Sequence, residues 1–520
     1  MTGTGSLLRL VLRRDRLLMP LWIVCLALAP VGYLSSIKAA YPDAAARQHF
    51  YDLNASSATF VVRNGPLYGS SLGNLLAWQC GFVPVVVGLI ALLTVVRHTR
   101  TEEEAGRREL TGATVVGRHA GLAAAVLATC GACLMYGLVV GLGVAAQGVP
   151  AAGAFALGGG FALTGWVFAG VGAVAAQLTW GASGARGVGI GALVLAFLLR
   201  AAGDSSGSAG WLAWLSPIGW AHRMRPFAGE QWWVLAVGVV ATGLLVALAV
   251  ALSARRDLGA ALLPARLGRA TAKASLRSPL ALAWRLQRGT LVVWTVCLAL
   301  VGLLMGGVAQ NVAEMMRDNQ AVGEIFSRMG GGGAVTDAYL AGTMTLFGLA
   351  AAGYAVQATL KLRAEEAGGR AEPVLATAVG RVGWAAGHLA FAVLGSAFLL
   401  AVTGLATGAA YGSGASLVPA ALAQLPAVWV LAGLAAALIG FFPRFAAAAW
   451  GLLGGFLLLS LVGTALRWND VVLGISPFQH LARLPGGTFT VAPVLWLALI
   501  AVVAGAGGLA ALRRRDLPVG

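Results

Sequence analysis

Long apolar runs separated by short polar segments dominate the chain. A helix that crosses the hydrocarbon core of a bilayer needs roughly 20 predominantly apolar residues. Runs of that kind recur throughout, six in each half of the sequence. They begin near Leu17, Leu75, Ala120, Phe155, Val188, Trp233, Thr290, Tyr339, Trp384, Leu417, Phe445 and Val491. The pattern predicts an all-α integral membrane protein with twelve transmembrane helices.

Short sequence landmarks recur in the same order in both halves. The paired landmarks are Trp22–Leu28 with Trp294–Leu300, Gly117-Arg118 with Gly380-Arg381, Ser216-Pro217 with Ser476-Pro477, and Arg255–Leu258 with Arg514–Leu517. Because each repeat holds an even number of spans, both copies keep the same orientation in the membrane. We therefore predict two tandem six-helix halves related by pseudo-two-fold symmetry, over residues 1–258 and 290–520. A basic cytoplasmic linker with an interfacial helix is expected over 259–289.

Composition and charge support a membrane protein. Hydrophobic residues make up 59% of the 520 positions, charged residues 11%, and the mean hydropathy is +0.82, far from the values of soluble domains. The net charge of +17 lies in short loops between the apolar runs, which is typical of topology signals and lipid contacts and not of nucleic-acid binding. With a cytoplasmic N-terminus, most Lys and Arg fall on the inner side, so both termini are expected there.

Arginine greatly outnumbers lysine, and Ala and Gly are abundant, which favours a bacterial source and hence the inner membrane. Amphipathic segments over residues 7–16 and 280–288 mix Leu, Val and Trp with Arg. They predict helices that lie in the inner membrane interface.

Two charged segments, which we call the islands, each follow the second apolar run of a half: Glu103–Glu109 and Glu365–Glu372. Thr101 stands three residues before Glu104, the spacing of a capping box. Glutamates precede arginines by four residues at Glu103/Arg107, Glu104/Arg108 and Glu366/Arg370, a spacing that stiffens an exposed helix. We therefore expect one rigid cytoplasmic helix per half.

The second island differs from the first by an additional Gly369 and by Pro373, which should end its helix. A solvated connector would explain a single charged helix. The duplication favours docking of two soluble partners, at sites that need not be equal.

The E-E-A-G-R-x-E segment, the Gly-Arg that follows it and the doubled six-span unit resemble fused permeases of ATP-binding-cassette (ABC) exporters of the polyketide-antibiotic (tetronasin-like) type. In such permeases the loop between the second and third spans carries the coupling helix that binds the ATPase. The resemblance places these helices near 101–112 and 363–373. It implies an ATPase-coupling role for Glu103, Glu104, Gly106, Arg107, Arg108, Glu109, Arg118, Glu365, Glu366, Gly368, Arg370, Glu372 and Arg381.

No ATPase or metal motif is found in the sequence. A phosphate-binding loop needs Gly-Lys followed by Ser or Thr, but none of the three lysines, Lys38, Lys273 and Lys361, follows a glycine. We expect a transport subunit that is not an enzyme and binds no cofactor, with ATP and Mg held by two copies of a separate cytosolic ATPase. Cys130 and Cys133 lie in an apolar run without a nearby His, so neither a metal site nor a disulfide is expected.

Two other function classes stay open. A proton-coupled transporter of the major facilitator type needs ionisable residues inside the bilayer. Arg200 and Asp204 come closest, but we expect them to reach the outer interface, with a substrate or gating contact as the alternative. A membrane transferase needs clustered catalytic groups, whereas His222 and His480 follow Ser-Pro without a paired acid in the sequence.

The cargo is expected to be amphiphilic or hydrophobic, either an antibiotic or drug or a lipid-like compound, because the spans offer aromatic and amide groups but few charges. A cavity between the halves is expected. Candidate lining residues, for which packing or lipid contact is the alternative role, are Trp78, Gln79, Phe82, Phe197, Phe347, Tyr354, Gln357 and Phe456.

Overall fold

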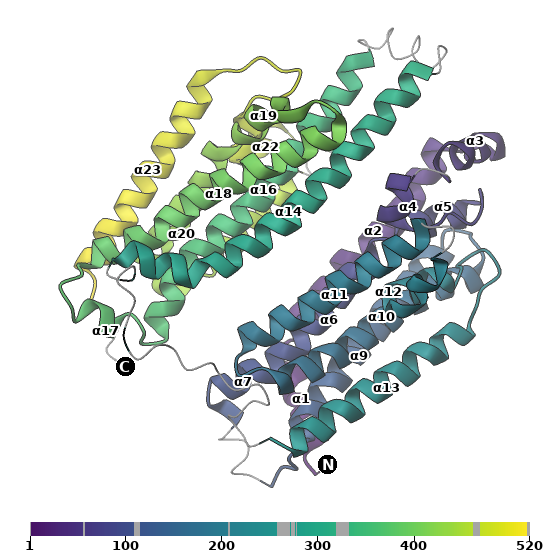
Figure 1. The fold of residues 1–520 in the computed structure, drawn as a ribbon, viewed down its shortest axis with the longest axis horizontal. Helices are drawn as coiled ribbons and strands as arrows, with labels where there is room; N and C mark the ends of the chain where they lie inside the picture. The colour runs from purple at the N-terminus through teal and green to yellow at the C-terminus, as the bar shows by residue number, and fades with distance from the viewer. Residues whose placement is uncertain are drawn as a thin grey trace. The chain divides into compact units, whose positions relative to one another are not determined.

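A computed structural model describes residues 2–55, 58–108, 115–205, 209–256, 271, 276, 278–318, 332–460 and 469–516. Contacts between residues divide the chain into two compact units, unit 1 (Met1–Gly268) and unit 2 (Arg269–Gly520). Every regular element in the described ranges is helical (Figure 1). The predicted domain boundaries at 258 and 290 stay predictions.

Unit 1 is built around α10 (Ala151–Leu178), whose apolar stretch is 78% buried. It contacts α6 (Val83–His98), α9 (Ala120–Ala145), α11 (Ala182–Ser205) and α13 (Trp233–Ala254). The remaining elements are α1 (Thr4–Arg14), α2 (Leu18–Ala40), α3 (Ala44–Asn54), α4 (Ala58–Asn64), α5 (Leu72–Gln79), α7 (Arg100–Glu104), the 3-10 helix η1 (Gly210–Leu215) and α12 (Pro217–Arg223).

Glycines allow α9 and α10 to pack backbone against backbone. A Cβ atom at Gly137 would lie 2.5 Å from the carbonyl oxygen of Gly158, and a Cβ atom at Gly158 would overlap the carbonyl oxygen of Gly137. In lipid, helices gain little from the hydrophobic effect when they associate, so van der Waals contact between them matters more. Small residues strengthen that contact because they let the two backbones approach closely. This crossing fixes the centre of unit 1.

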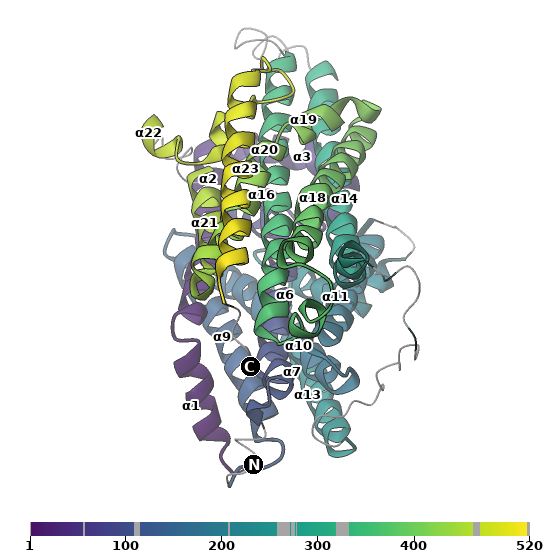
Figure 2. The ribbon, with the colours of Figure 1, turned by 90° about the vertical axis from the view of Figure 1, so that its left-hand side faces the viewer.

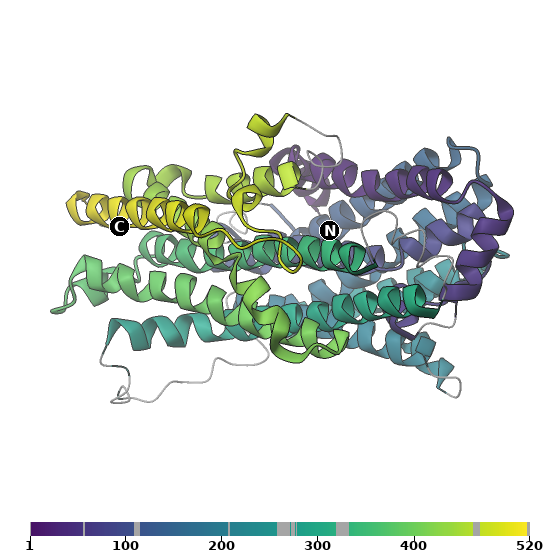
Figure 3. The ribbon, with the colours of Figure 1, turned by 90° about the horizontal axis from the view of Figure 1, so that it is seen from above.

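In unit 2 the most buried long helix is α16 (Gly332–Ala367). Its neighbours α14 (Pro279–Asp318) and α18 (Arg381–Tyr411) lie side by side, as do α20 (Leu425–Phe441) and α23 (Val491–Arg514) (Figures 2 and 3). The shorter elements are α17 (Glu372–Leu375), η3 (Gly414–Leu417), α19 (Val418–Leu422), η4 (Pro443–Phe445), α21 (Ala448–Leu458), α22 (Asp470–Leu473) and η6 (Pro477–His480).

Unit 2 has close helix approaches between α20 and α23, where a Cβ atom at Gly440 would overlap the carbonyl oxygen of Gly508, and between α14 and α18. A Cβ atom at Gly302 of α14 would lie 2.9 Å from the carbonyl oxygen of Thr403 in α18, and one at Gly306 would overlap the carbonyl oxygen of Thr407. In unit 1 the tightest crossing joins α9 to α10. The two units therefore pack their helices differently, although their sequences share landmarks.

Ten helices among the described residues are long and apolar enough to cross a membrane, or eleven if the pair Gly414–Leu422 and Leu425–Phe441, bent by 40°, counts as one span. The predicted run near Phe445 coincides with α21, which has 11 residues, and residues 461–468 lie outside the described ranges. The twelfth span and the two-fold symmetry stay predictions.

Two local expectations are wrong. The segment 280–288 is not a separate interfacial helix, because α14 continues from Pro279 through the predicted seventh span. The second apolar run is not one helix either, because α5 ends at Gln79 and α6 begins at Val83. At this break a Cβ atom on Gly81 would overlap the backbone of Asn64, so the C-terminus of α4 packs directly against the break.

Candidate functional site

The first island is the end of a helix followed by a turn. The chain bends at Thr99 between α6 and α7, and it turns again at Gly106, whose φ of 69° favours glycine. The Thr101 hydroxyl accepts a hydrogen bond from Arg186 at 3.3 Å, and Thr99, not Thr101, is the N-cap residue of α7, without a side-chain cap bond. The predicted capping box and single rigid helix are therefore wrong for the described residues. Glu109 lies outside them.

Glu103 is the centre of a buried ion cluster. Its carboxylate lies 3.0 Å from Arg100, 2.8 Å from Arg256 and 3.7 Å from Arg108. The side chains of Glu103, Arg100 and Arg256 are only 6%, 2% and 4% exposed. Arg256 also donates to the side-chain oxygen of Gln177 at 3.1 Å. Buried charges are tolerated when they are paired and hydrogen-bonded, as these are. Because Arg256 follows α13, the cluster joins α6–α7 to the segment after α13.

The neighbouring glutamates bind other elements. The Glu104 carboxylate accepts the backbone N–H of Ala182 at 3.0 Å, which satisfies a free donor in the first turn of α11. Glu102 lies 2.5 Å from Arg14 of α1 and 2.7 Å from Arg107. The hydrogen bond to Glu102 raises the pKa of Arg107. Arg107 thus pairs with Glu102, five positions earlier in the chain, because the turn at Gly106 interrupts the helical spacing.

Arg108 lies on the inner side of the turn. It approaches Glu103 and not the predicted Glu104. Burial lowers the pKa of Arg108, and the charge of Glu103 opposes that shift. Arginine remains charged in proteins, so Arg108 adds a third cation beside the Glu103 carboxylate.

The second island has the same construction. Helix α16 ends at Ala367, and the turn has Gly369 at φ 68°. Glu366 lies 3.2 Å from Arg363 and forms an ion pair with Arg515. Glu365 lies 2.8 Å from Arg370 and 3.2 Å from Lys361. These contacts mirror those around Glu103 and Glu102.

The contacts set the register between the islands. Arg100 and Glu103 correspond to Arg363 and Glu366, each three apart, and the turn glycine Gly106 corresponds to Gly369. Gly369 is therefore not an insertion, and the sequence alignment that paired Glu103 with Glu365 was one residue out of register. Pro373 does not end a helix, because it lies in the first turn of α17, where proline is favoured.

Arginines that follow the islands bind the same helix ends. Arg118 donates to the carbonyl oxygens of Ser253 and Arg256 at 3.0 and 2.5 Å. Arg381 donates to those of Arg513 and Arg515 at 3.4 and 2.6 Å. Cations stabilise the carbonyl-rich C-terminus of a helix. In each unit, the end of the last long helix is thus held from two sides, by a glutamate of the island and by the arginine that follows the island.

The predicted coupling residues divide into buried and exposed groups. Glu103, Glu365 and Glu366 face the interior of their own unit. Exposed positions lie at the turns and just after them, namely Glu104, Ala105, Arg107, Ala367, Gly368, Gly369, Arg370, Glu372 and Pro373. A protein partner would contact this second group.

The predicted cargo residues of unit 1 form two pairs. Trp78 and Gln79 line a groove of about 200 Å³ together with Tyr41 and Phe50, which belong to the α2–α3 region. Phe82 and Phe197 contact each other edge to face, with ring centroids 6.0 Å apart. The groove is lined by uncharged groups alone.

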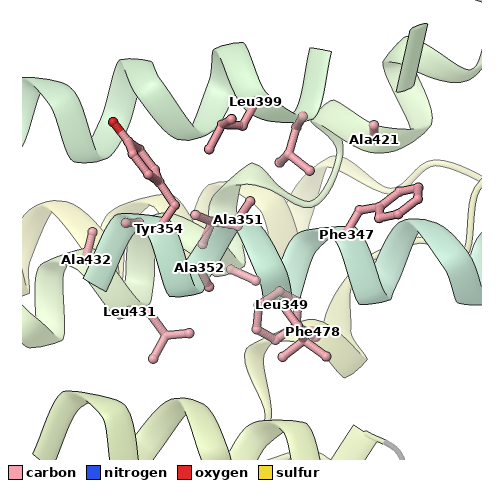
Figure 4. Packing of buried hydrophobic residues seen from close by; sticks show 14 of the residues in the cluster. Phe347, Leu349, Ala351, Ala352, Tyr354, Leu399, Ala421, Leu431, Ala432 and Phe478 are labelled. Carbon is pink, nitrogen blue, oxygen red and sulfur yellow. The ribbon is translucent and has the colours of Figure 1, made fainter. Parts of the chain in front are cut away.

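In unit 2, Phe347 and Tyr354 are buried in the core around α16 (Figure 4). The Tyr354 hydroxyl donates to the carbonyl oxygen of Phe391 at 3.2 Å. Gln357 accepts a hydrogen bond from Trp294 at 2.8 Å, and Phe456 packs against the same core. Their contacts within unit 2 are those of packing residues, and their role in cargo binding stays a prediction.

Sequence comparison identifies the family. Residues 276–513 match the family described as multidrug efflux system permease Rv1217c, C-terminal domain. The chain is 44% identical over 526 aligned residues to the multidrug efflux system permease protein Rv1217c of Mycobacterium tuberculosis (strain ATCC 25618 / H37Rv), covering 99% of this chain and 95% of that protein. The chain belongs to the Rv1217c family of multidrug efflux permeases. It is a multi-pass membrane protein and a transport subunit of a drug exporter.

In this Rv1217c-family permease, Arg200 does not extend to an exposed surface as a snorkelling side chain would. Its side chain is fully buried and donates to the carbonyl oxygens of Val61 and Val62 at 3.1 and 2.8 Å, so it caps the C-terminus of α4. Asp204 lies 3.8 Å from both Arg200 and His222. His222 thus has an acidic neighbour, contrary to the sequence-based expectation.

The histidines of this permease have structural contacts. His222 bonds the carbonyl oxygen of Gly81 at 3.0 Å, and His480 bonds that of Gly474 at 2.7 Å. Within the described part of the chain, no three His, Cys, Asp or Glu side chains are grouped so that they could hold a metal ion. Cys130 and Cys133 are free thiols.

Sequence reasoning missed Arg100, Arg256, Arg363 and Arg515 as members of the site. Arg256 and Arg515 belong to the Arg-Arg-Asp-Leu landmark that ends each half. That repeat was read as a sign of duplication and topology. Because this landmark recurs in both halves, as the islands do, its recurrence was the available sequence signal for a contact between the landmark and the island.

Proposed function

We propose that the chain is the complete permease of an ABC exporter of the polyketide-antibiotic type, which moves amphiphilic or hydrophobic compounds out of a bacterial cell. Two copies of a separate ATPase supply the energy, one at each island. The protein lies in the inner membrane, and both chain termini and both islands face the cytoplasm. The 44% identity to a multidrug efflux permease carries the proposal. The duplicated islands and the lack of a phosphate-binding motif in the sequence support the separate ATPase.

The exposed turns of the islands form the proposed docking surface. Replacing Ala105 and Ala367 with Trp adds bulk at two exposed positions and removes none of the ion pairs behind them. We expect the double variant to reach the membrane in normal amount and to lose co-purification of the ATPase. Pull-down of the ATPase with affinity-tagged permease measures this directly.

A matched control is Ala152→Trp, which replaces an exposed alanine in the first turn of α10. This turn lies at the opposite end of α10 from the segment that contains Trp180 and Ala182. This variant should bind the ATPase like the unmodified chain. Undiminished ATPase recovery with the Ala105→Trp/Ala367→Trp variant would refute docking at the turns.

The energy source separates this proposal from a proton-coupled facilitator, for which the buried Asp204 is the strongest candidate carrier. We expect dye efflux from cells to continue when an uncoupler collapses the proton gradient and ATP is maintained by a fermentable carbon source. Collapse of efflux at constant ATP would favour the facilitator. Measuring both dye and ATP levels in the same culture distinguishes the two.

The groove beside Trp78 and Gln79 supports uncharged cargo, because formal charges are missing from its lining. An aromatic ring fits a cavity of about 150 Å³. The groove therefore suits a ring-bearing part of an amphiphile and not a whole drug.

A further inference from the structure

In each unit, a glutamate of the island and the arginine that follows the island both bind the end of the last long helix, and we call these two contacts the clamp. In unit 1, Arg256 pairs with Glu103 while Arg118 binds the Arg256 carbonyl oxygen. In unit 2, Arg515 pairs with Glu366 while Arg381 binds the Arg515 carbonyl oxygen. The same two contacts, made by one glutamate and two arginines, thus recur in both units.

The clamp recurs although the long helices of the two units cross differently. Unit 1 makes its tightest glycine crossing between α9 and α10, whereas unit 2 makes one between α14 and α18. A contact that merely filled space would follow such changes. The glutamates of the clamp are also buried, because the side chains of Glu103 and Glu366 are only 6% and 3% exposed. Salt therefore screens the ion pairs of the clamp little.

The island does not depend on the clamp for its charge balance. Glu103 keeps Arg100 and Arg108 if Arg256 is removed, and Glu366 keeps Arg363 if Arg515 is removed. What Arg256 and Arg515 add is a connection to α13 and α23. This separates a linking role from a role in folding the island.

We infer that Arg256 and Arg515 are positioning residues that make α13 and α23 move with the islands when the ATPase moves them. The inference rests on the proposed function. A helix end held both by its side chain and by its backbone carbonyl follows the island as one body, so motion at the docking surface reaches the full length of the span.

The test uses the permease–ATPase complex in liposomes, with the amphiphilic dye Hoechst 33342 as cargo. In the Arg256→Gln/Arg515→Gln variant, we expect the ATPase to stay bound and to hydrolyse ATP, while dye moved per ATP falls about tenfold, within the usual range of coupling between sites. Arg256→Lys/Arg515→Lys restores the charge and should recover most of the transport. A residue that only stabilised the fold would not change the ratio of transport to hydrolysis.

The matched control is Arg255→Gln/Arg514→Gln, which removes the same charge from the adjacent exposed positions. It should leave dye moved per ATP unchanged. Unchanged coupling in the Arg256→Gln/Arg515→Gln variant overturns the inference. Loss of the ATPase from that variant also overturns it, by assigning the clamp to docking, but leaves the proposed function standing. Failure of the unmodified chain to bind an ATPase would instead refute the proposed function.

A cross-link provides a second test that does not depend on that variant folding. Cysteines replace Glu366 and Arg515 in a chain whose five native cysteines are alanines, and a short bis-maleimide joins them. A link that moves as one body should still transport dye after cross-linking. Arrest of transport by the cross-link would show that the clamp opens during the cycle, which contradicts the inference.

Discussion

Replacing Glu103 with Gln should lower the free energy of unfolding by about 3–5 kcal/mol, because it leaves buried cations without their counter-ion. Arg100 and Arg256 are 2% and 4% exposed and face the same carboxylate oxygen. Glutamine keeps the shape of the side chain but not its charge. The apparent unfolding temperature of the purified protein in detergent, followed by fluorescence-detected size exclusion, should fall by several degrees.

Glu102 is the matched control for this prediction. It is the adjacent residue, but its partners Arg14 and Arg107 are 42% and 50% exposed, and exposed ion pairs contribute about 1 kcal/mol or less. Glu102→Gln should therefore change the unfolding temperature little. Equal shifts for the two variants would show that burial of the Glu103 cluster has no energetic weight.

Replacing Gly158 with Val should separate α9 from α10 and destabilise unit 1 by about 3 kcal/mol, the upper part of the range for overpacked cores. The added Cβ atom would overlap the carbonyl oxygen of Gly137. Backbone atoms cannot rotate away as a flexible side chain can, so the helices themselves must shift. Reduced yield of folded protein and a lower unfolding temperature are the expected results.

Gly131→Val in α9 is the control for placing a valine in a helix as such, which costs no helix propensity relative to glycine. A Cβ atom at Gly131 meets nothing within 4 Å, so this variant introduces the same side chain without the collision. It should be nearly as stable as the unmodified chain. If Gly131→Val and Gly158→Val behave alike, the close crossing does not limit stability.

Most of the fold prediction was based on the apolar runs and on the repeats in the sequence. Spanning helices are recognisable because each must satisfy its backbone hydrogen bonds internally and present apolar side chains to lipid. The break before α6 was not recognisable, since residues 75–98 read as a single apolar run. At this break the C-terminus of α4 packs directly against Gly81, a tertiary contact that the apolar pattern does not reveal.

The islands show the same division. Their position after the second run of each half was evident from the charges, but the partners of those charges were not. Helical spacing predicted Glu103 with Arg107, whereas Gly106 turns the chain and pairs Arg107 with Glu102. A glycine at a positive φ leaves no mark that separates it from any other glycine in the sequence.

The sequence by itself determined the membrane class, the recurrence of its landmarks and the place of the two charged segments, because these depend on local hydrophobicity and on repetition. Only the tertiary structure decided that Glu103 and Glu366 are buried and bound to Arg256 and Arg515. It also decided that Arg200 caps α4. Each of these contacts joins residues more than a hundred positions apart, and a charge at such a distance is paired by the packing of helices and not by any spacing along the chain.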